Sequence, residues 1–351
     1  MDVNKAVAFL EESFLKDLVN NPKVTDISFN GQDIFYVDNE FGRIKNPLTI
    51  EKAVAKDFVR QIANLTEKQF SYQSPELDVS FGRYRFNALH QSICRKNNEE
   101  SICFAIRIAS SSLKFKEKDS LTTEVKELLQ VLVNSNVSIV IGGLTGSGKT
   151  ELQKYLISLM KENTRAIVID NILELDQFQT EKSIDLNIWQ VDEKRAAASI
   201  ENLVRNGLRS NPDWLIVAES RGKEMLDVLN SSLTGHPIIT TLHAFDINTI
   251  PTRMVRMVMM NEQRMNFQDV YNDITYHMRF YIYLKRKYLT DGSVKRYISS
   301  ISYLNDRGME EIYGSDGVKK YYRPLSTEAM KMLDLTGISA QFKAAFIGGK
   351  K

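Results

Sequence analysis

Apolar positions in the first hundred residues change their period several times along the chain. A helical spacing over residues 3–20 stops at Asn21-Pro22, because proline cannot continue a helix. Asn30-Gly31 is typical of a hairpin turn between two strands. The predicted helices cover residues 3–20 and 50–63, and the predicted strands cover residues 24–29, 34–37, 79–89 and 101–108. This region is therefore expected to form a small α+β unit.

Beyond residue 121, short apolar runs alternate with helical segments. Thr122 or Thr123 is suited to cap a helix that runs to about Val133. Alternating β and α segments predict a mostly parallel sheet with helices on both faces and a ligand site at the carboxyl ends of the strands. The predicted strands cover residues 138–141, 166–169, 215–218 and 238–242, and a last hairpin covers residues 280–285 and 294–303 around Asp291-Gly292.

A polar and charged segment separates these two patterns. It begins with three serines, Ser110 to Ser112, and continues with five charged residues up to Asp119. Such a composition is typical of a linker between domains. We therefore expect an N-terminal α+β domain over residues 1–110, a linker over residues 111–121 and an α/β domain over residues 122–351.

The composition excludes some classes of protein. A chain of 351 residues is long enough for two domains, and its net charge of +2 gives none of the basic field of a dedicated nucleic-acid binder. Cys94 and Cys103 lack the spacing of metal ligands and are expected to be buried or incidental thiols in a reducing compartment. No segment approaches the ~18 apolar residues of a membrane span, and residues 1–5 lack a signal-peptide pattern. We expect a cytoplasmic protein with only peripheral membrane contact.

The most informative motif is a glycine-rich loop between a strand and a helix. Residues 143–150 match the phosphate-loop pattern G-x-x-x-x-G-K-[ST] at every fixed position. Glycines allow successive N–H groups to point at phosphate oxygens, and the following helix contributes its positive N-terminal end. Lys149 is expected to reach the β- and γ-phosphates of a nucleoside triphosphate, and the Thr150 hydroxyl to hold Mg²⁺. The residues expected to bind the nucleotide here are Gly143, Thr145, Gly146, Ser147, Gly148, Lys149 and Thr150.

Two other apolar runs end in acidic residues. Residues 214–218 lead into Glu219, which is the Walker B arrangement of a carboxylate that organises Mg²⁺ or its waters. Residues 166–169 lead into Asp170, and Glu174 follows where a carboxylate could orient or deprotonate the attacking water. A solvated acid at the end of a strand is the alternative for each.

His243 follows the strand predicted over residues 238–242. At the end of that strand its ring could sense the γ-phosphate or contact a neighbouring subunit. A purely structural histidine is an equally good interpretation of the spacing.

The order of these motifs resembles a known family. Beyond the phosphate loop and the acid-rich strand end, the chain has Leu208-Arg209, Asn211-Pro212-Asp213, Glu219-Ser220-Arg221-Gly222, Thr234-Gly235-His236 and Thr241-Leu242-His243-Ala244. This order closely resembles the secretion ATPase superfamily of type II and type IV secretion, pilus assembly and pilus retraction. Within it the chain looks most like the conjugation, type IV secretion and Flp/tight-adherence pilus branch. Residues 24–31, 85–88 and 106–107 extend the resemblance into the first domain.

The resemblance implies a fold and an activity. The fold is a RecA-like P-loop domain with a smaller, PAS-like N-terminal domain, and the assembly is a homo-oligomer, a hexameric ring. The activity is hydrolysis of ATP with Mg²⁺ to power a secretion, conjugation or type IV pilus machine from the cytoplasmic side of the membrane. Its partners would be inner-membrane platform proteins, with peripheral contact to the membrane itself, and direct binding of nucleic acid is not expected.

The resemblance also implies roles for individual residues. Glu174 matches the proposed general base, and Arg85 and Arg107 fall where the first domain supplies arginines to the nucleotide. An arginine delivered across a subunit boundary can stabilise the charge of the transition state, and a surface salt bridge is the alternative for each arginine. The residues given catalytic roles are Glu174, Glu219, His243, Arg209 and Arg221.

Two alternatives stay open, the first of them because of a departure from the family pattern. Asp170-Asn171 stands where the family usually has Glu-Asp, which could weaken metal organisation and slow turnover. The first alternative is a nucleotide-gated assembly scaffold with little hydrolysis. The second is a RecA-like DNA translocase, which predicts a basic, aromatic-rich channel.

Overall fold

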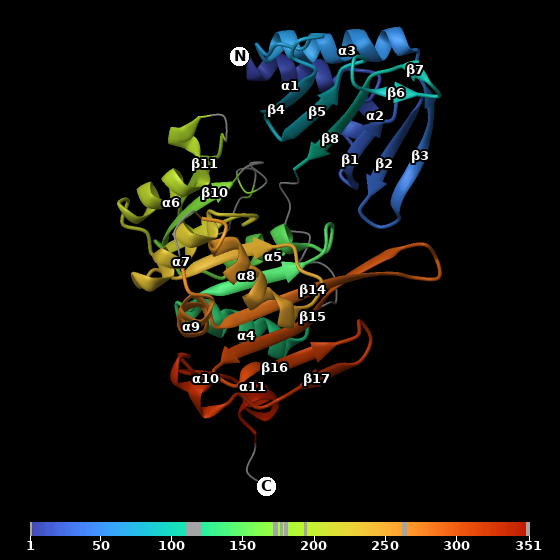
Figure 1. Cartoon of the computed structure of the whole chain (residues 1–351). Coiled ribbons are helices and arrows are strands. Elements are labelled where there is room, and N and C mark those ends of the chain that lie inside the picture. The colour runs from blue at the N-terminus through green and yellow to red at the C-terminus, as the bar shows by residue number, and fades with distance from the viewer. Residues whose placement is uncertain are drawn as a thin grey trace. The chain divides into compact units, whose positions relative to one another are not determined.

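A computed structural model describes residues 2–109, 121–170, 175, 178, 182–192, 195–261 and 265–348. The chain separates into two compact units, which Figure 1 draws in one view. Unit 1 comprises Met1–Ser111 with Tyr288–Val294, and unit 2 comprises Ser112–Lys287 with Lys295–Lys351. Residues 111–120 of the predicted linker, 111–121, lie outside the described residues, so the predicted domain boundary stays a prediction.

Unit 1 contains a six-stranded antiparallel sheet in the order β3-β2-β1-β8-β5-β4. The helices α1 and α3 lie side by side along one face of this sheet (Figure 1). Phe58 of α3 packs against Phe86 and Phe104 of the sheet, which closes the core. The elements are α1 Val3–Glu11, α2 Lys16–Val19, α3 Lys52–Leu65, β1 Val24–Phe29, β2 Asp33–Asp38, β3 Gly42–Thr49, β4 Glu76–Phe81, β5 Tyr84–Leu89 and β8 Cys103–Ile108. A short hairpin, β6 Arg95–Lys96 with β7 Glu99–Glu100, forms a separate ribbon.

Three expectations for unit 1 are wrong in detail. The helix predicted over residues 3–20 is two helices, because the Ser13 side chain accepts from the Leu15 N–H and donates to the Leu10 carbonyl, and so competes with the helical ladder. The strand predicted over residues 79–89 is the pair β4 and β5, which turns at Gly82. Cys94 and Cys103 are joined in a disulfide and are not free thiols.

Strand β3 has no counterpart in the sequence-based prediction. It is one of the two edge strands of the sheet, and all but its first residue are at least partly exposed. An edge strand buries little apolar surface, so it lacks the alternation that makes a strand visible in the sequence.

Unit 2 contains a nine-stranded sheet in the order β11-β10-β12-β13-β9-β14-β15-β16-β17. Figure 1 labels β10 and β11 and the last four strands, β14 to β17. The pairings from β11 to β14 are parallel, as the alternation of β and α segments predicts. The last strands, β15 to β17, are antiparallel and extend the sheet on one side. The strands are β9 Ile139–Gly143, β10 Arg165–Asp170, β11 Asp185–Gln190, β12 Trp214–Val217, β13 Ile238–Leu242, β14 Phe280–Tyr288, β15 Val294–Asn305, β16 Gly308–Ser315 and β17 Lys320–Tyr322.

Helices cover both faces of this sheet. Ile139 and Ile141 of β9 enter the core beneath α4 and α5, whereas Val140 between them enters the core beneath α6 to α9. Fully buried parallel strands have apolar residues on both faces, which explains their continuous apolar runs in the sequence. The helices are α4 Thr123–Asn134, α5 Lys149–Ser158, α6 Ile200–Leu208, α7 Met225–Leu233, α8 Ile250–Val258, α9 Phe267–His277, α10 Thr327–Lys331 and α11 Ala340–Phe342, with 3₁₀ turns at Ala196–Ala198 and Ile247–Thr249 and a π-helix at Lys343–Ile347.

The C-terminal segment belongs to the core of unit 2. Phe342 and Phe346 are fully buried beside α4, and the Glu127 carboxylate of α4 accepts from the Ser339 N–H at 2.7 Å. Thr122, the predicted cap of α4, accepts from the Val125 N–H as expected. Among the residues that the structure describes, no helix is both long and apolar enough to cross a bilayer.

We predict that Phe342→Ala lowers the free energy of unfolding of unit 2 by about 3–5 kcal/mol, because it leaves a cavity in a fully buried cluster. Urea unfolding followed by tryptophan fluorescence measures this, since Trp189 and Trp214, the two tryptophans of the chain, both belong to unit 2. The matched control is Phe245→Ala, at a phenylalanine that is 83% exposed, which we expect to change stability by less than about 0.5 kcal/mol. Equal effects of the two substitutions would contradict the packing described for the C-terminal segment.

Candidate functional site

The phosphate loop joins β9 to α5 at the carboxyl edge of the sheet. A side-chain Cβ on Gly143 would lie 2.5 Å from the Ser147 Oγ and 2.7 Å from the Leu284 carbonyl, so only glycine fits there. Gly148, the cap of α5, has φ +99°, in the left-handed region that favours glycine. The fixed glycines of the motif are therefore required by the backbone itself.

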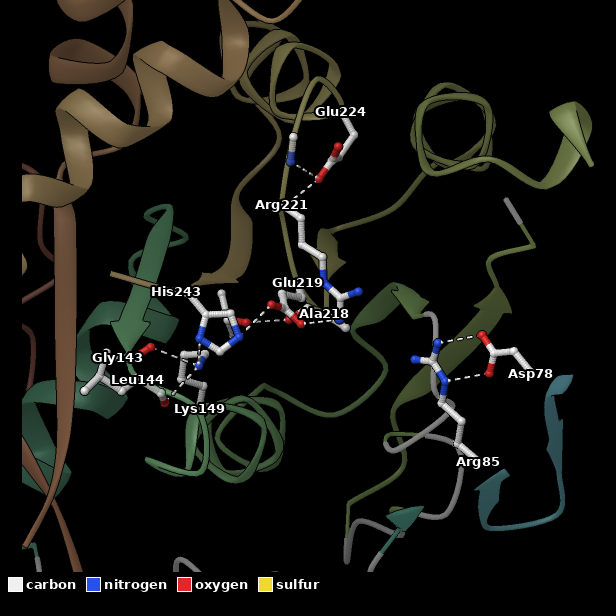
Figure 2. A network of polar contacts seen from close by, with 12 residues as sticks. Asp78, Arg85, Gly143, Leu144, Lys149, Ala218, Glu219, Arg221, Glu224 and His243 are labelled. Atoms are coloured by element: carbon white, nitrogen blue, oxygen red, sulfur yellow. Dashed lines mark hydrogen bonds and ion pairs between the residues drawn. The ribbon is translucent and has the colours of Figure 1, made fainter. Parts of the chain in front are cut away.

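Lys149 bends back over the loop, where it is almost completely buried. Its Nζ donates to the Gly143 carbonyl at 3.0 Å and to the Leu144 carbonyl at 3.2 Å, as Figure 2 shows. The same Nζ lies 3.3 Å from His243 Nδ1. A buried ammonium needs such partners, because removing a charge from water is otherwise costly.

His243 stands between Lys149 and Glu219, at the end of β13 (Figure 2). A lysine ammonium can only donate, so Nδ1 accepts and the ring proton is carried on Nε2. Nε2 lies 3.0 Å from Glu219 Oε1, although not in the direction of a hydrogen bond. Burial, and then the charge of Lys149, lower the pKa of His243 against the opposing effect of Glu219, so the ring is neutral near pH 7.

Glu219 follows β12 and is held as a carboxylate by its neighbours. Burial by itself would raise the pKa of Glu219, but the hydrogen bond and charge of Arg221, followed by His243 and Lys149, outweigh it and lower the pKa. Arg221 Nη2 lies 2.7 Å from Glu219 Oε2. The Glu224 carboxylate in turn accepts from the Arg221 and Gly222 N–H groups, which fixes the turn that carries Arg221 (Figure 2).

The ends of β12 and β13 are tied together beside the site. Thr241 Oγ1 donates to the Ala218 carbonyl at 2.7 Å, and the Ser220 N–H donates to the Thr241 carbonyl at 2.8 Å. Ser220 Oγ and Thr240 Oγ1 are 2.8 Å apart and both are buried. Ser220 therefore acts as a polar link between the strands that carry Glu219 and His243, a contact that the sequence motif did not indicate.

The donor set fits a Mg²⁺ ion. Glu219 Oε1 is buried and accepts no hydrogen bond from any residue that the structure describes, and the buried Ser147 Oγ is equally without a partner there. Mg²⁺ prefers oxygen ligands and is bound through one or two protein groups together with water and phosphate oxygens. An ionised carboxylate at Glu219 and the hydroxyl of Thr150, in the first turn of α5, are ligands of this kind.

Some predicted site residues do not join this group. Thr145 is an exposed residue of the phosphate loop. Arg209 is the C-terminal cap of α6. The carbonyl of the adjacent Ser210 accepts a hydrogen bond from Arg165 at the start of β10. Arg209 therefore lies toward the opposite edge of the sheet from the phosphate loop. Glu174 lies outside the described residues, whereas Asp170 is buried as the last residue of β10.

The two predicted arginines of unit 1 are cross-strand partners. Arg85 of β5 lies opposite Arg107 of β8 in an antiparallel register, so both side chains project from the same face of the sheet. Arg85 makes a two-pronged contact with Asp78, with Nε 3.2 Å from Oδ1 and Nη2 3.0 Å from Oδ2 (Figure 2). Their contact with a nucleotide stays a prediction.

Comparison with known proteins matches this chain to one family. A profile of the family described as "Type II/IV secretion system protein" matches residues 88–274. An uncharacterised protein of Bacillus anthracis is 27% identical over 315 residues, which cover 86% of this chain and 69% of that protein. The type IV secretion system protein VirB11 of Brucella suis is 33% identical over 130 residues, which cover only 36% of each chain. The type IV secretion system protein PtlH of Bordetella pertussis is 32% identical over 135 residues, 38% of this chain and 40% of PtlH.

Solved structures share the fold at lower sequence identity. The ATPase DotB of Legionella pneumophila superposes with a TM-score of 0.61 at 21% identity, covering 88% of this chain and 82% of that chain. The pilus retraction motor PilT, solved with bound ADP, gives a TM-score of 0.58 at 20% identity, covering 84% and 82%. These matches confirm the predicted α/β, RecA-like fold. The match of the family profile over more than half of the residues places the chain in the type II/IV secretion system protein family.

Proposed function

We propose that this protein is an ATPase that works as a hexameric motor of a type IV secretion, conjugation or pilus machine, acting from the cytoplasmic side of the membrane. The observation that carries the proposal is the meeting of Lys149, His243 and Glu219 at the carboxyl edge of the parallel sheet. A phosphate loop with its lysine and a buried carboxylate that can hold Mg²⁺ are groups that phosphoryl transfer to water uses. The neutral His243 lies against both of them.

Each group has a distinct part in this proposal. Lys149 supplies the positive charge that neutralises the β- and γ-phosphates, and it exchanges its contacts with the loop carbonyls for phosphate oxygens. His243 is proposed to link the position of Lys149 to that of Glu219, because its Nδ1 lies 3.3 Å from Lys149 Nζ and its Nε2 lies 3.0 Å from Glu219 Oε1. Glu174 is proposed as the general base, and Arg209 or Arg221 as the arginine that acts across a subunit boundary.

Magnesium completes the proposed site. Glu219 and Thr150 would hold the ion, which neutralises charge that develops on the phosphate oxygens when it is bound. Arg221 keeps the Glu219 carboxylate ionised and holds its Oε2, while Oε1 accepts no hydrogen bond from the residues that the structure describes. An exposed ion pair adds little to the stability of a fold. The proposed role of the Arg221–Glu219 pair is therefore to orient Glu219 as a ligand of the metal ion.

The scaffold alternative remains the second candidate because of Asp170-Asn171. Asp170 is buried at the end of β10, and one of its oxygens lies 3.5 Å from the Leu175 N–H. A short acid held at the strand end reaches less far toward the phosphate loop than the glutamate that the family usually has there. ATP binding without turnover would favour this alternative.

The proposed function is tested by ATP hydrolysis and light scattering on the same purified samples. Particles of hexamer mass that hydrolyse ATP would support a ring motor. Monomers that hydrolyse ATP would contradict the ring, and hexamers that bind ATP without hydrolysing it would favour the scaffold. Stimulation of hydrolysis by DNA would favour the translocase instead.

We predict that Lys149→Ala weakens ATP binding by about 2–5 kcal/mol, which is a rise of ~30-fold or more in Kd, because a buried charge partner of the phosphates is lost. Titration with a fluorescent ATP analogue measures the affinity. Lys161→Ala, at an exposed lysine just beyond the same helix, is the matched control and should bind like the unsubstituted protein. If Lys149→Ala bound the ATP analogue as tightly as the unsubstituted protein, the phosphate loop would not be the nucleotide site.

We expect Glu219→Gln to bind ATP with an affinity within a few-fold of that of the unsubstituted protein. Its rate of ATP hydrolysis should fall by about 100-fold or more, which is the scale of a lost catalytic carboxylate. The substitution keeps the shape of the side chain and removes the charge that Arg221 stabilises. Steady-state hydrolysis over a range of Mg²⁺ concentrations measures the effect, and Glu162→Gln at an exposed position is the control. Unchanged hydrolysis would exclude Glu219 from metal binding and catalysis.

Glu174→Gln is predicted to leave nucleotide affinity and hexamer mass unchanged and to lower the rate of hydrolysis by about 100-fold or more, because the amide cannot accept the proton of water. Asn171→Asp in the same segment tests the departure from the family pattern and should raise the rate. Hydrolysis at an undiminished rate in Glu174→Gln would assign the general base to another residue.

A further inference from the structure

Strands β14 and β15 bring two arginines to the phosphate loop. β14 pairs in parallel with β9, with Leu284 opposite Gly143, so Arg286 lies just beyond the level at which β9 enters the loop. β15 is the next strand of the sheet and carries Arg296. The order of the strands thus places Arg296 beside the loop, although it is 150 positions away from Gly146 in the sequence.

Both arginines contact the same glycine. The Arg296 Nε–H donates to the Gly146 carbonyl at 2.8 Å, and the Arg296 Cδ lies 3.8 Å from where a Cβ on Gly148 would stand. Arg286 Nη1 would lie only 2.9 Å from a Cβ on Gly146, whose φ is +72°. A larger residue at this position would displace the end of the Arg286 side chain, so the Arg286 guanidinium lies directly against the loop at Gly146.

The contact with Arg296 fixes the orientation of one peptide in the loop. In a trans peptide the carbonyl and the N–H point in opposite directions, so holding one end sets the other. The Gly146 carbonyl is held by Arg296, and the Ser147 N–H of the same peptide donates to the Leu144 carbonyl at 3.2 Å. A glycine-rich loop otherwise has much conformational freedom to lose when it binds a ligand.

The two guanidinium groups also add charge beside the loop. Arginine stays protonated at every physiological pH, and its planar group recognises phosphate oxygens well. With Lys149, the chain therefore places three cationic side chains around residues 143–149. A triphosphate gains from such a field, and it gains more when the field is already in place.

We propose that Arg286 and Arg296 position the phosphate loop for a nucleoside triphosphate, and that they make nucleotide affinity depend on β14 and β15. Arg296 is a positioning residue that acts through the Gly146 carbonyl. Arg286 packs against the same glycine and contributes the second charge. The inference rests on the proposed function, because it assumes that the loop binds a nucleotide.

The first test needs no nucleotide. Hydrogen exchange is measured on the peptide that covers residues 143–148 in Arg296→Met, which keeps an unbranched side chain out to the ε position and removes the guanidinium group with its Nε–H. We expect the Ser147 amide to exchange about three- to tenfold faster, since one hydrogen bond that holds its peptide is lost. Lys295→Gln is the control, because the neighbouring residue on a strand projects to the opposite face and its loss removes the same charge.

The second test measures the affinity for a fluorescent ATP analogue in the full chain. Arg296→Met and Arg286→Gln are each expected to weaken binding about tenfold, the scale for hydrogen bonds that involve a charged group. Arg296→Lys keeps the charge but cannot place a donor where Nε lies, so it should stay weakened at least threefold if positioning matters. Thermal unfolding midpoints equal to that of the unsubstituted protein show that these losses are local.

The outcomes separate this inference from the proposed function. Binding that Lys149→Ala abolishes and that Arg296→Met leaves within twofold would overturn the inference and leave the proposed function intact. Full recovery in Arg296→Lys would overturn the positioning role. An unsubstituted protein that binds no nucleotide would overturn the proposed function and this inference with it, whereas faster exchange together with weaker binding would support both.

Discussion

The pairing of β9 with a parallel strand on each side is the constraint on which the site depends. β13 lies on one side of β9 and β14 on the other, and β12 follows β13. Parallel strands all end at the same edge of the sheet, so the phosphate loop, His243 and Glu219 must meet there. The same pairing brings Arg286 to the loop from the other direction. Any change in the order of these strands would therefore separate the groups that the proposed chemistry needs.

Burial of charge makes this edge of the sheet an interdependent unit. Lys149 is buried and held by two carbonyls, and Glu219 is kept ionised by Arg221 although burial alone would favour its protonated form. His243 is neutral between them and can face both groups without adding a charge. Because each group is stabilised by its neighbours, a ligand that moves Lys149 also changes the surroundings of His243 and Glu219. The ends of β12 and β13, which carry Glu219 and His243, are tied to each other through Ser220, Thr240 and Thr241.

The C-terminal part of the chain extends the sheet and contacts the phosphate loop. Its strands extend the sheet past β14, and its last helices bury Phe342 and Phe346 against α4. Arg296 then reaches from β15 to the loop. The loop is consequently anchored on one side by its own helix and on the other by residues far along the chain, a more rigid setting than the glycine content of residues 143–148 suggests.

The sequence by itself determined the local features whose cause is local. The phosphate loop, the helix cap at Thr122 and the buried parallel strands follow from short patterns, because glycine conformation, capping and continuous apolar runs act over a few residues. It also placed Glu219 and His243 at strand ends. Tertiary structure alone decided what these residues touch: the contact of His243 with both Lys149 and Glu219, the link from Ser220 to Thr240, and the bond from Arg296 to Gly146. Edge strands such as β3 and β11 also escaped prediction, because they bury too little apolar surface to leave a periodic pattern. Contacts between residues 94 or 150 positions apart depend on the order of strands in the sheet, which no short stretch of sequence contains.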